Sequence, residues 1–523
     1  MTLKMSRSTG SILLCLLMMA ILSTGALAQN WTVGGGSVRN DRNASSEKSI
    51  SAGNVGGLAL KWAFTTQGDV SATPTVEGKV AYVVDWGGWI HAVDTDTGSA
   101  RWSVKLSTIT GSEPSISRTS PAIYKDLVII GDQGDLDQIM GFPAGNYKTA
   151  SVIALNKNTG ALVWRTVVDS HPFSAVTSSP VVSGKTLVVG VCSLEEAAGF
   201  IPGWQYFFRG KVVALDASNG SMIWQTYMVP PGYTGGAVWG GTPAVDDSRK
   251  SVYVATGNNY SVPPAVEAQI AADPANGESY LAADDYIDAV LSLDLKTGAI
   301  NWGKRLQGAD TWNVVRDFTP DQFDPGQGPD YDFGSGPNLF TAKVGGNSFD
   351  LVGAGQKSGR YWALNPDTGA VVWMTQVGPG GLAGGIQWGS ATDGTRVYVA
   401  VSNNDGKPYT TLNGETKSAG LWAGLNAATG AYIWQTPDPL DGKDYGMVTV
   451  ANDVVFAGSN SGHMYAMNAV SGQVLWSFNS GGTVMCGPSV VKGTVYWGSG
   501  YGRFGGAFGG PGANNKLYAF YLP

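Results

Sequence analysis

The sequence predicts an all-β fold: an eight-bladed β-propeller in which both ends of the chain close the last blade. Three observations predict it: a repeated hairpin motif, two further strand-like segments before most hairpins, and an unpaired half-hairpin at each end. The composition agrees, because 74 of the 523 residues are glycine and only 14% are charged. Such a chain suits many short strands and turns better than long solvated helices.

The repeated hairpin places a glycine four residues before a tryptophan, as in "ALDASNGSMIW" (214–224). An Asp or Asn can bond the turn backbone, the glycine can adopt a positive φ, and the alternating residues that follow begin the partner strand. We expect the tryptophan to pack on the neighbouring blade rather than to act in catalysis. The seven pairs are Gly98/Trp102, Gly160/Trp164, Gly220/Trp224, Gly298/Trp302, Gly369/Trp373, Gly430/Trp434 and Gly472/Trp476.

The remaining strands complete the blades and close the ring. Segments such as "SATPTVEGKVAYVVD" (71–85) predict two strands upstream of a hairpin, which gives four strands per blade. Near the C-terminus, "KLYAF" (516–520) lacks an outer partner, whereas "LKWAFTT" (60–66) lacks an inner one. Pairing the two supplies the eighth blade and removes the sheet edges that a linear array would expose.

Long insertions between strands predict where a site lies. Successive blade tryptophans, starting at Trp62, are 40 to 78 residues apart, against about 40–45 for a bare four-stranded blade. The insertions are residues 103–150, 190–210, 256–290 and 303–350. One of them contains "RDFTPDQFDPGQGPDYDFGSGP" (316–337). Its carboxylates are suited to calcium but lack the 12-residue loop spacing, so a solvated rim loop is expected.

The N-terminus is typical of an export signal. Basic residues precede the apolar run "SILLCLLMMAIL" (11–22), and "ALA" (26–28) offers a cleavage site. We expect residues 1–28 to be removed and residues 29–523 to form one secreted or periplasmic propeller domain without a membrane span. An uncleaved anchor is the alternative, although the apolar run is shorter than the roughly 20 residues that a bilayer requires.

Charge and cysteine content exclude other classes of protein. The formal net charge is −7 without a basic stripe, which argues against nucleic-acid binding. The mature chain keeps Cys192 and Cys486, too few for a disulfide scaffold, and the sequence leaves their pairing open. It also leaves open whether the Asn-x-Ser/Thr sites at Asn30, Asn43, Asn219 and Asn259 carry glycans.

Familiar catalytic motifs are absent from the sequence. There is no nucleophile elbow, phosphate-binding loop, zinc spacing or Cys-x-x-Cys-His haem motif. The three histidines, His91, His171 and His463, fall in separate repeats. We interpret them as ordinary blade residues.

Four segments carry a resemblance to a known family: "GGAVWGGTPAVD" (235–246), "ATGNNY" (255–260), "GADTW" (308–312) and "GAGQKSGRYWALNPDTG" (353–369). With the hairpins, they resemble the quinoprotein alcohol dehydrogenases that use pyrroloquinoline quinone, above all the polyvinyl-alcohol-dehydrogenase-like branch. The resemblance runs from about Asn30 to the C-terminus. It implies an alcohol substrate, pyrroloquinoline quinone and calcium as cofactors, and an external electron acceptor such as a cytochrome c or a quinone.

The resemblance assigns cofactor-binding roles to five residues. Trp239 matches the tryptophan that stacks under the quinone, and Lys357 matches the cation that faces the quinone oxygens. Arg118 and Thr177 resemble partners of the cofactor carboxylates, and Trp388 resembles a residue of the same pocket. The alternatives are a core aromatic for Trp239 and a turn lysine for Lys357.

The resemblance also assigns a metal site and a base. Glu196 and Asn258 match oxygen ligands of calcium, although Glu195 is an alternative ligand and Asn258 is an alternative turn residue. Asp310 matches the aspartate that approaches the metal and takes the proton of the substrate hydroxyl; a surface-loop aspartate is the alternative.

Two departures from the family pattern bear on activity. The branch usually has two adjacent cysteines that cover the quinone, whereas Gln205 and Tyr206 stand at the corresponding place here; Tyr206 is a speculative substitute cover. Methanol-type members have a second aspartate where this chain has Asn313, which leaves the identity of the base open. The rival hypothesis is therefore a non-catalytic secreted propeller that serves as a binding or assembly scaffold.

Overall fold

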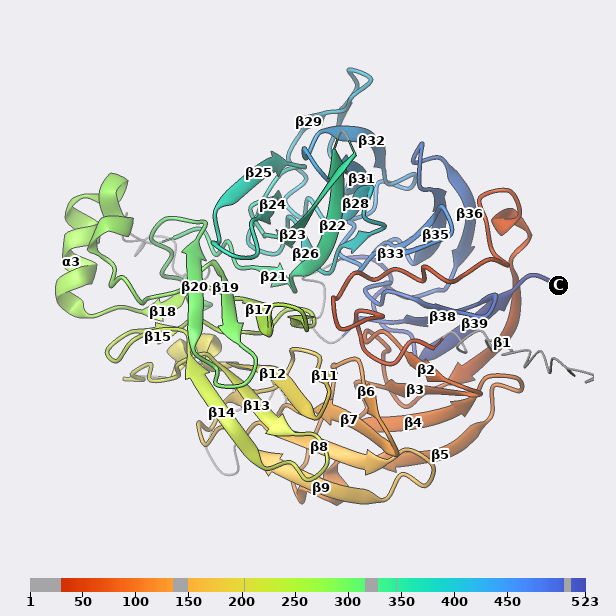
Figure 1. Cartoon of the computed structure of the whole chain (residues 1–523), viewed down its shortest axis with the longest axis horizontal. Helices are drawn as coiled ribbons and strands as arrows, with labels where there is room; N and C mark the ends of the chain where they lie inside the picture. The colour runs from red at the N-terminus through yellow and green to blue at the C-terminus, as the bar shows by residue number, and fades with distance from the viewer. Residues whose placement is uncertain (1–29, 135–148, 202, 316–327, 345, 503–508) are drawn as a thin grey trace, which may run out of the picture.

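Eight antiparallel sheets, seven of four strands and one of five, are arranged around one axis in the computed structural model (Figure 1). The structure describes residues 30–134, 149–201, 203–315, 328–344, 346–502 and 509–523. The predicted eight-bladed propeller is thereby confirmed. The expected signal, residues 1–28, lies outside the described residues.

Each blade runs from a short strand near the axis to a long outer strand. Blade 1 consists of β2 (Thr75–Glu77), β3 (Val80–Val84), β4 (Trp89–Asp94) and β5 (Ala100–Lys105), and blade 2 of β6 (Ala122–Tyr124), β7 (Leu127–Gly131), β8 (Ser151–Asn156) and β9 (Leu162–Val167). Blade 3 consists of β11 (Val181–Ser183), β12 (Thr186–Ser193), β13 (Lys211–Asp216) and β14 (Met222–Tyr227), and blade 4 of β16 (Ala244–Asp246), β17 (Ser251–Ala255), β19 (Ala289–Asp294) and β20 (Ile300–Arg305).

Blades 5 to 8 repeat this order. Blade 5 consists of β22 (Asn338–Val344), β23 (Asn347–Gly355), β24 (Arg360–Leu364) and β25 (Val371–Gln376), and blade 6 of β27 (Ala391–Thr392), β28 (Arg396–Val401), β31 (Leu421–Asn426) and β32 (Tyr432–Pro437). Blade 7 consists of β33 (Thr449–Ala451), β34 (Val454–Gly458), β35 (His463–Asn468) and β36 (Val474–Asn479), and blade 8 of β37 (Ser489–Val491), β38 (Thr494–Ser499), β39 (Lys516–Tyr521) and β1 (Ala59–Thr65).

Smaller elements lie in the insertions and connections. They are β10 (Ser174–Ala175), β15 (Thr234–Gly235), β18 (Asn259–Ser261), β21 (Gly334–Ser335), β26 (Gln387–Trp388), β29 (Tyr409–Thr410), β30 (Thr416–Lys417), α1 (Ser107–Thr110), α3 (Pro264–Ala272), η1 (Val55–Gly57), η2 (Glu195–Phe200) and η3 (Pro274–Tyr280). No helix in the described ranges is both long and apolar enough to cross a bilayer.

The two ends of the chain close the ring, as the sequence predicts. Strand β1 pairs antiparallel with β39, with Ala59 opposite Tyr521 and Thr65 opposite Lys516. In Figure 1 the blue β38 and β39 lie beside β1 at the right of the ring. Because β39 then has a partner on both sides, the eighth blade is complete and no half-blade is left open to edge-to-edge association.

The repeated tryptophan joins each blade to the next, and this role is confirmed at all eight blades. Each indole Nε1 donates a hydrogen bond to a backbone carbonyl in the following blade, and seven indoles also lie against the hairpin glycine of that blade. The donor and acceptor pairs are Trp62–Thr95, Trp102–Lys157, Trp164–Ala217, Trp224–Leu295, Trp302–Pro366, Trp373–Ala427, Trp434–Ala469 and Trp476–Leu58.

The N-terminal segment closes one end of the axis. Residues 31–44 form backbone hydrogen bonds with the innermost strands of six blades, at Val76, Ile123, Val245, Leu339, Thr392 and Val450. Arg42 is 2% exposed and donates to Gly34, Val448, Thr73 and Thr449. Burial lowers the pKa of Arg42 to about 10, which leaves the guanidinium charged at neutral pH. The segment is therefore a plug that shapes the floor of the central cavity.

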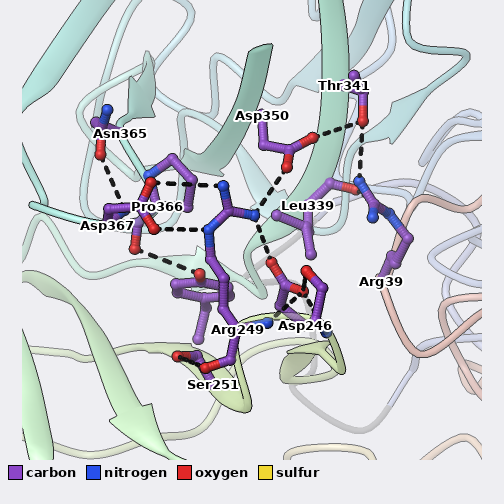
Figure 2. Close-up of polar contacts among 12 residues, drawn as sticks. Arg39, Asp246, Arg249, Ser251, Leu339, Thr341, Asp350, Asn365, Pro366 and Asp367 are labelled. Carbon is purple, nitrogen blue, oxygen red and sulfur yellow. Dashed lines mark hydrogen bonds and ion pairs between the residues drawn. The ribbon is translucent and has the colours of Figure 1, made fainter. Parts of the chain in front are cut away.

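An ion cluster joins blades 4 and 5 through turns and strand ends of the two blades (Figure 2). Arg249, in the turn between β16 and β17, lies 2.8 Å from Asp246 of its own blade. It also lies 2.8 Å from Asp350 and 2.7 Å from Asp367, both in blade 5. The hydrogen bonds to Asp367, Asp246 and Asp350 raise the pKa of Arg249 further above its usual value. The cluster is three-quarters shielded from solvent at Arg249, so it fixes the contact between two blades whose insertions build the site.

Candidate active site

A cavity lies on the axis, where the segments before the innermost strands converge. Its walls come from seven blades and include aromatic, hydroxyl, thioether and guanidinium groups: Ser71, Arg118, Thr177, Ser179, Gly241, Trp388, Met447, Met485 and Tyr501. The cavity volume is about 30 Å³, which is room for only a few water molecules. A larger planar ligand requires side chains at its mouth to move apart.

Arg118 and Trp388 cover this cavity together. The guanidinium carbon of Arg118 lies 5.4 Å from the ring centroid of Trp388 and 6.0 Å from that of Trp86. Its Nε atom is buried without a hydrogen-bond acceptor among the described residues. Since a guanidinium presents its donors in one plane, Arg118 has the geometry to receive a carboxylate.

Trp239 and Trp388 form the aromatic part of the site. Their rings are 5.3 Å apart and nearly perpendicular, at 84°. Thr177 Oγ1 donates a hydrogen bond of 2.8 Å to the carbonyl of Trp239, so Thr177 holds the backbone beneath the ring. Trp388 has φ +53°, a conformation that is costly for a bulky residue and is found mainly where a site constrains the chain.

Lys357 is enclosed by two aspartates. Its Nζ lies 2.9 Å from both carboxylate oxygens of Asp330 and 3.5 Å from Asp332 Oδ2. It also lies 5.3 Å from the ring centroid of Trp239. Burial alone would lower the pKa of Lys357, but the charges of Asp330 and Asp332 raise it above its usual value. The ammonium therefore stays protonated beside the aromatic ring.

Asn258 presents an oxygen to the same region. Its side-chain Nδ2 donates to the carbonyls of Asn259 and Trp312, at 2.7 and 2.8 Å. Because the amide nitrogen is committed, the amide oxygen is the atom left to accept a donor or a cation. The residue is 2% exposed, and its backbone N–H donates to Asp332 Oδ1 at 2.8 Å.

Asp310 is fully buried next to these groups. Its carboxylate accepts hydrogen bonds from the backbone N–H groups of Asp330 (3.1 Å) and Tyr331 (2.8 Å). Burial raises the pKa of Asp310 to about 6. Burial, together with the charges of Asp310 and Asp332, also raises the pKa of Asp288 well above its usual value, so Asp288 keeps its proton at neutral pH. Asp310 is thus an ionised carboxylate at neutral pH, but with few lone pairs uncommitted.

Glu196 lies in η2 within electrostatic reach of Lys357. The alternative ligand, Glu195, is fully buried and holds the following loop, because its carboxylate accepts from Trp204 Nε1, Phe207 N and Phe208 N. His171 Nε2 also lies 3.1 Å from Glu195. Glu195 is therefore a structural residue, which leaves Glu196 as the candidate ligand.

Five of the eight predicted residues, Arg118, Thr177, Trp239, Lys357 and Trp388, form one chain of direct contacts. Asn258 and Asp310 join it through Asp332 and Asp330, which both lie against Lys357, and Glu196 is within electrostatic reach of Lys357. No group of three or more His, Cys, Asp or Glu side chains with a metal-binding arrangement occurs within the described parts of the chain. The acidic donor set suits calcium, since Glu196, Asn258 and Asp310 all offer oxygen. Their roles stay predictions.

The predicted rim loop is wrong for its described part. Residues 316–327 lie outside the described residues, but Asp330 and Asp332, at 2% and 5% exposure, point inward to Lys357. The sequence shows an Asp-rich segment, and this composition by itself indicates a solvent-exposed loop. The cation that pairs with the two aspartates, Lys357, lies about 25 residues further along the chain, and the sequence does not show that the two segments meet.

The cysteines and histidines are structural. Cys192 and Cys486 are both buried and unbonded to each other, which answers the open question of their pairing. Burial raises the pKa of the Cys486 thiol to about 12. His91 is fully buried and contacts Ser103 and Asp85 within blade 1, as expected for a blade residue.

Comparison with known proteins decides the family. A sequence-family model described as "Outer membrane protein assembly factor BamB" matches residues 57–201, 143–304, 208–383 and 417–507. Polyvinylalcohol dehydrogenase of a Sphingopyxis species is 30% identical over 501 residues, which cover 85% of this chain and 68% of that protein. The chain belongs to the quinoprotein alcohol dehydrogenase family. Quinohemoprotein alcohol dehydrogenase ADH IIB of Pseudomonas putida, also of this family, is 24% identical over 85% of the chain and 69% of its own length.

Solved structures agree on the fold. Quinohemoprotein alcohol dehydrogenase from Comamonas testosteroni superposes with a TM-score of 0.68 at 19% identity, covering 94% of this chain and 80% of that one. BamB from Moraxella catarrhalis, at 15% identity, covers 89% of this chain and 97% of that one with a TM-score of 0.51. The quinoprotein dehydrogenase fold therefore describes this ring more closely than the assembly factor does.

Proposed function

We propose that this chain is a pyrroloquinoline-quinone- and calcium-dependent dehydrogenase that oxidises an alcohol and passes the electrons to a separate acceptor. The observation that supports it best is the convergence at the axis of Arg118, Trp239, Lys357, Asn258 and Asp310, which come from blades 2, 4 and 5 and their insertions. The related proteins named polyvinylalcohol dehydrogenase support the reaction class.

The residues present fit the quinone by their chemistry. Trp239 offers an aromatic face on which a planar ring could stack, and Trp388 lies nearly perpendicular to it. Arg118 and Thr177 would hold the carboxylates of the cofactor, since they offer guanidinium and hydroxyl donors. When bound, pyrroloquinoline quinone supplies the two-electron acceptor and calcium supplies a Lewis acid. Lys357 holds a fixed positive charge over the ring of Trp239, 5.3 Å from its centroid, and this charge would favour the negative charge that a bound quinone gains on reduction.

Asp310 is the proposed base. Alcohol oxidation requires the hydroxyl proton to leave as hydride leaves the same carbon, and a buried carboxylate with a pKa of about 6 is ionised at neutral pH and ready to accept it. Glu196 and Asn258 are the proposed calcium ligands, with Asp310 as the third. Calcium would also balance the carboxylates that gather here, since Lys357 contributes a single positive charge.

The test is reconstitution of the purified chain with the quinone and Ca²⁺, followed by primary, secondary and polymeric alcohols and an artificial dye acceptor. We expect dye reduction and quenching of tryptophan fluorescence by the quinone. Asp310→Asn should abolish turnover, by about 10²–10⁴-fold, while quinone quenching stays nearly intact. Undiminished activity in this variant would show that another group is the base. Neither quenching nor dye reduction in the wild-type chain would favour the scaffold.

Export and electron transfer complete the proposal. The leader at residues 1–28 supports a secreted or periplasmic enzyme of residues 29–523. The proposed electron acceptor is a separate cytochrome c or a diffusible quinone. Tyr206 stays the candidate cover of the quinone; its ring lies 6.1 Å from that of Tyr260.

A further inference from the structure

One carboxylate connects three residues of the candidate site. Asp332 Oδ2 accepts a hydrogen bond of 2.8 Å from Trp239 Nε1 and lies 3.5 Å from Lys357 Nζ. Its Oδ1 accepts a hydrogen bond of 2.8 Å from the backbone N–H of Asn258. The residue is 5% exposed, so these bonds are shielded from competing water.

The backbone around Asp332 is clamped on both sides. Its carbonyl accepts from Lys357 N at 2.9 Å, and Phe333 N donates to Thr256 O at 3.2 Å. A Cβ at Gly257 would lie 2.8 Å from the Asp332 carboxylate, so glycine is required for this close approach. The segment therefore bridges the ends of strands from blade 4 and blade 5.

Strain marks the same segment. Asp330, two residues before Asp332, has φ +59°, a left-handed conformation that costs free energy outside glycine. This conformation places its carboxylate on Lys357, at 2.9 Å from Nζ through both oxygens. The next strand, β21, pairs in parallel with β26 and sets Ser335 beside Trp388, which is itself in a left-handed conformation. Such strain persists where surrounding contacts impose a functional geometry.

We infer that Asp332 is a positioning residue of the active site. It fixes the plane of the Trp239 indole, the place of the Lys357 ammonium and the backbone of Asn258 relative to one another. Asp330 neutralises Lys357, whereas Asp332 ties that cation to the aromatic face and to the proposed metal ligand. The expected effect of Asp332 on quinone binding rests on the proposed function. Its role in fixing Trp239, Lys357 and Asn258 rests only on contacts within the chain.

Two variants test it, Asp332→Asn and Asp332→Ala. Asparagine keeps the size of the side chain but loses its charge and one acceptor oxygen; alanine removes all three contacts. We expect quinone affinity, measured by fluorescence quenching, to fall by about 10–100-fold, as is usual when an orienting partner of a site residue is removed. The matched control is Asp350→Asn, which also removes a carboxylate paired with a cation, but in the Arg249 cluster outside the site. The control should bind the quinone like wild type.

A second readout does not depend on the quinone. The emission of Trp239 is obtained by subtracting the fluorescence spectrum of a variant with Trp239→Phe from the spectrum of the same protein without that change. The subtraction is made once for wild type and once for Asp332→Asn. We expect a shift of this emission in Asp332→Asn, because its indole N–H loses a charged acceptor, and no shift in Asp350→Asn. Unchanged Trp239 emission and unchanged quinone affinity in both Asp332 variants would overturn the inference. Failure of the wild-type chain to bind quinone would instead refute the proposed function, and the Trp239 emission would still decide the role of Asp332.

Discussion

At the scale of single residues, buried carboxyl groups link the region of the site to pH. Asp285 lies in the insertion of blade 4, between η3 and β19, is fully buried, and accepts a hydrogen bond of 3.2 Å from Asn259 Nδ2. Burial raises the pKa of Asp285 to about 7. The folded chain therefore holds a proton here that an unfolded chain releases near pH 4.

Asp285→Asn should remove a pH-dependent cost. Between about pH 4 and pH 7 the folded state binds more protons than the unfolded state at this position, so wild-type stability falls as the pH rises through this window. The variant lacks this loss, because asparagine keeps an oxygen for Asn259 but carries no charge. Urea unfolding at pH 5 and pH 8 should show the variant gaining about 1–3 kcal/mol relative to wild type at the higher pH.

The neighbouring Asp284 is exposed and supplies the control for this prediction. Asp284→Asn should differ from wild type by the same small amount at both pH values. If the free energy of unfolding of Asp285→Asn differs from that of wild type by the same amount at pH 5 and pH 8, the prediction is wrong. Asp285 would then already be ionised in the folded state at pH 5, despite its burial.

The segments that resemble the quinoprotein family predict part of the site. That resemblance assigns Trp239, Lys357, Asn258 and Asp310; the structure places Lys357 over Trp239 and links Asn258 and Asp310 to this pair through Asp332 and Asp330. Asp332 could not be assigned in this way, because its significance depends on contacts with three segments up to 93 positions away in the chain. An acidic segment by itself indicates a solvent-exposed loop, and only the structure shows that Asp332 is buried against its partners.

At the scale of elements, the hairpin turn sets how blades dock. Gly220 has φ +75°, and a Cβ on it would lie 2.5 Å from the Trp164 ring of the preceding blade. Gly184, in the same blade, has φ +59° but has no atom within 4 Å of such a Cβ. The two glycines therefore separate the cost of backbone conformation from the cost of inter-blade contact.

Gly220→Ala should destabilise the protein more than Gly184→Ala. The Gly184 substitution costs about 1–2 kcal/mol through backbone strain, and the Gly220 substitution adds about 1–3 kcal/mol because the indole must shift. The difference can be measured from the midpoints of urea unfolding followed by circular dichroism. Equal midpoints for the two variants would contradict the role assigned to the tryptophan contact.

The regular elements could be predicted because their signals are local. Alternation, turn residues and the Gly-to-Trp spacing mark the third and fourth strands of each blade, which agrees with hairpins such as β13–β14. The elements of the blade 4 insertion, α3 and η3, escaped prediction because their sequence has no amphipathic period and their order depends on packing around Ile270. The plug of residues 31–44 also could not be predicted, because its order depends on hydrogen bonds to blades that are distant in the sequence.

At the scale of the whole molecule, ring closure creates the site. Pairing of β1 with β39 completes the eighth blade, the tryptophans join each blade to the next, and the N-terminal plug binds the innermost strands of six blades. Segments far apart in the chain then meet at the cavity, where Arg118 lies beside Tyr501. The central claim is that this convergence forms one chamber for a planar quinone.

The structure of the chain crystallised with pyrroloquinoline quinone and Ca²⁺ tests this claim most directly. We predict that the tricyclic ring lies at the axis against Trp239, with a carboxylate on Arg118 and with Lys357 in contact with a ring oxygen. Arg118 and Trp388 should have separated, since the cavity of about 30 Å³ is too small for the ring. Electron density for the quinone away from the axis, with Arg118 and Trp388 still stacked, would contradict the account.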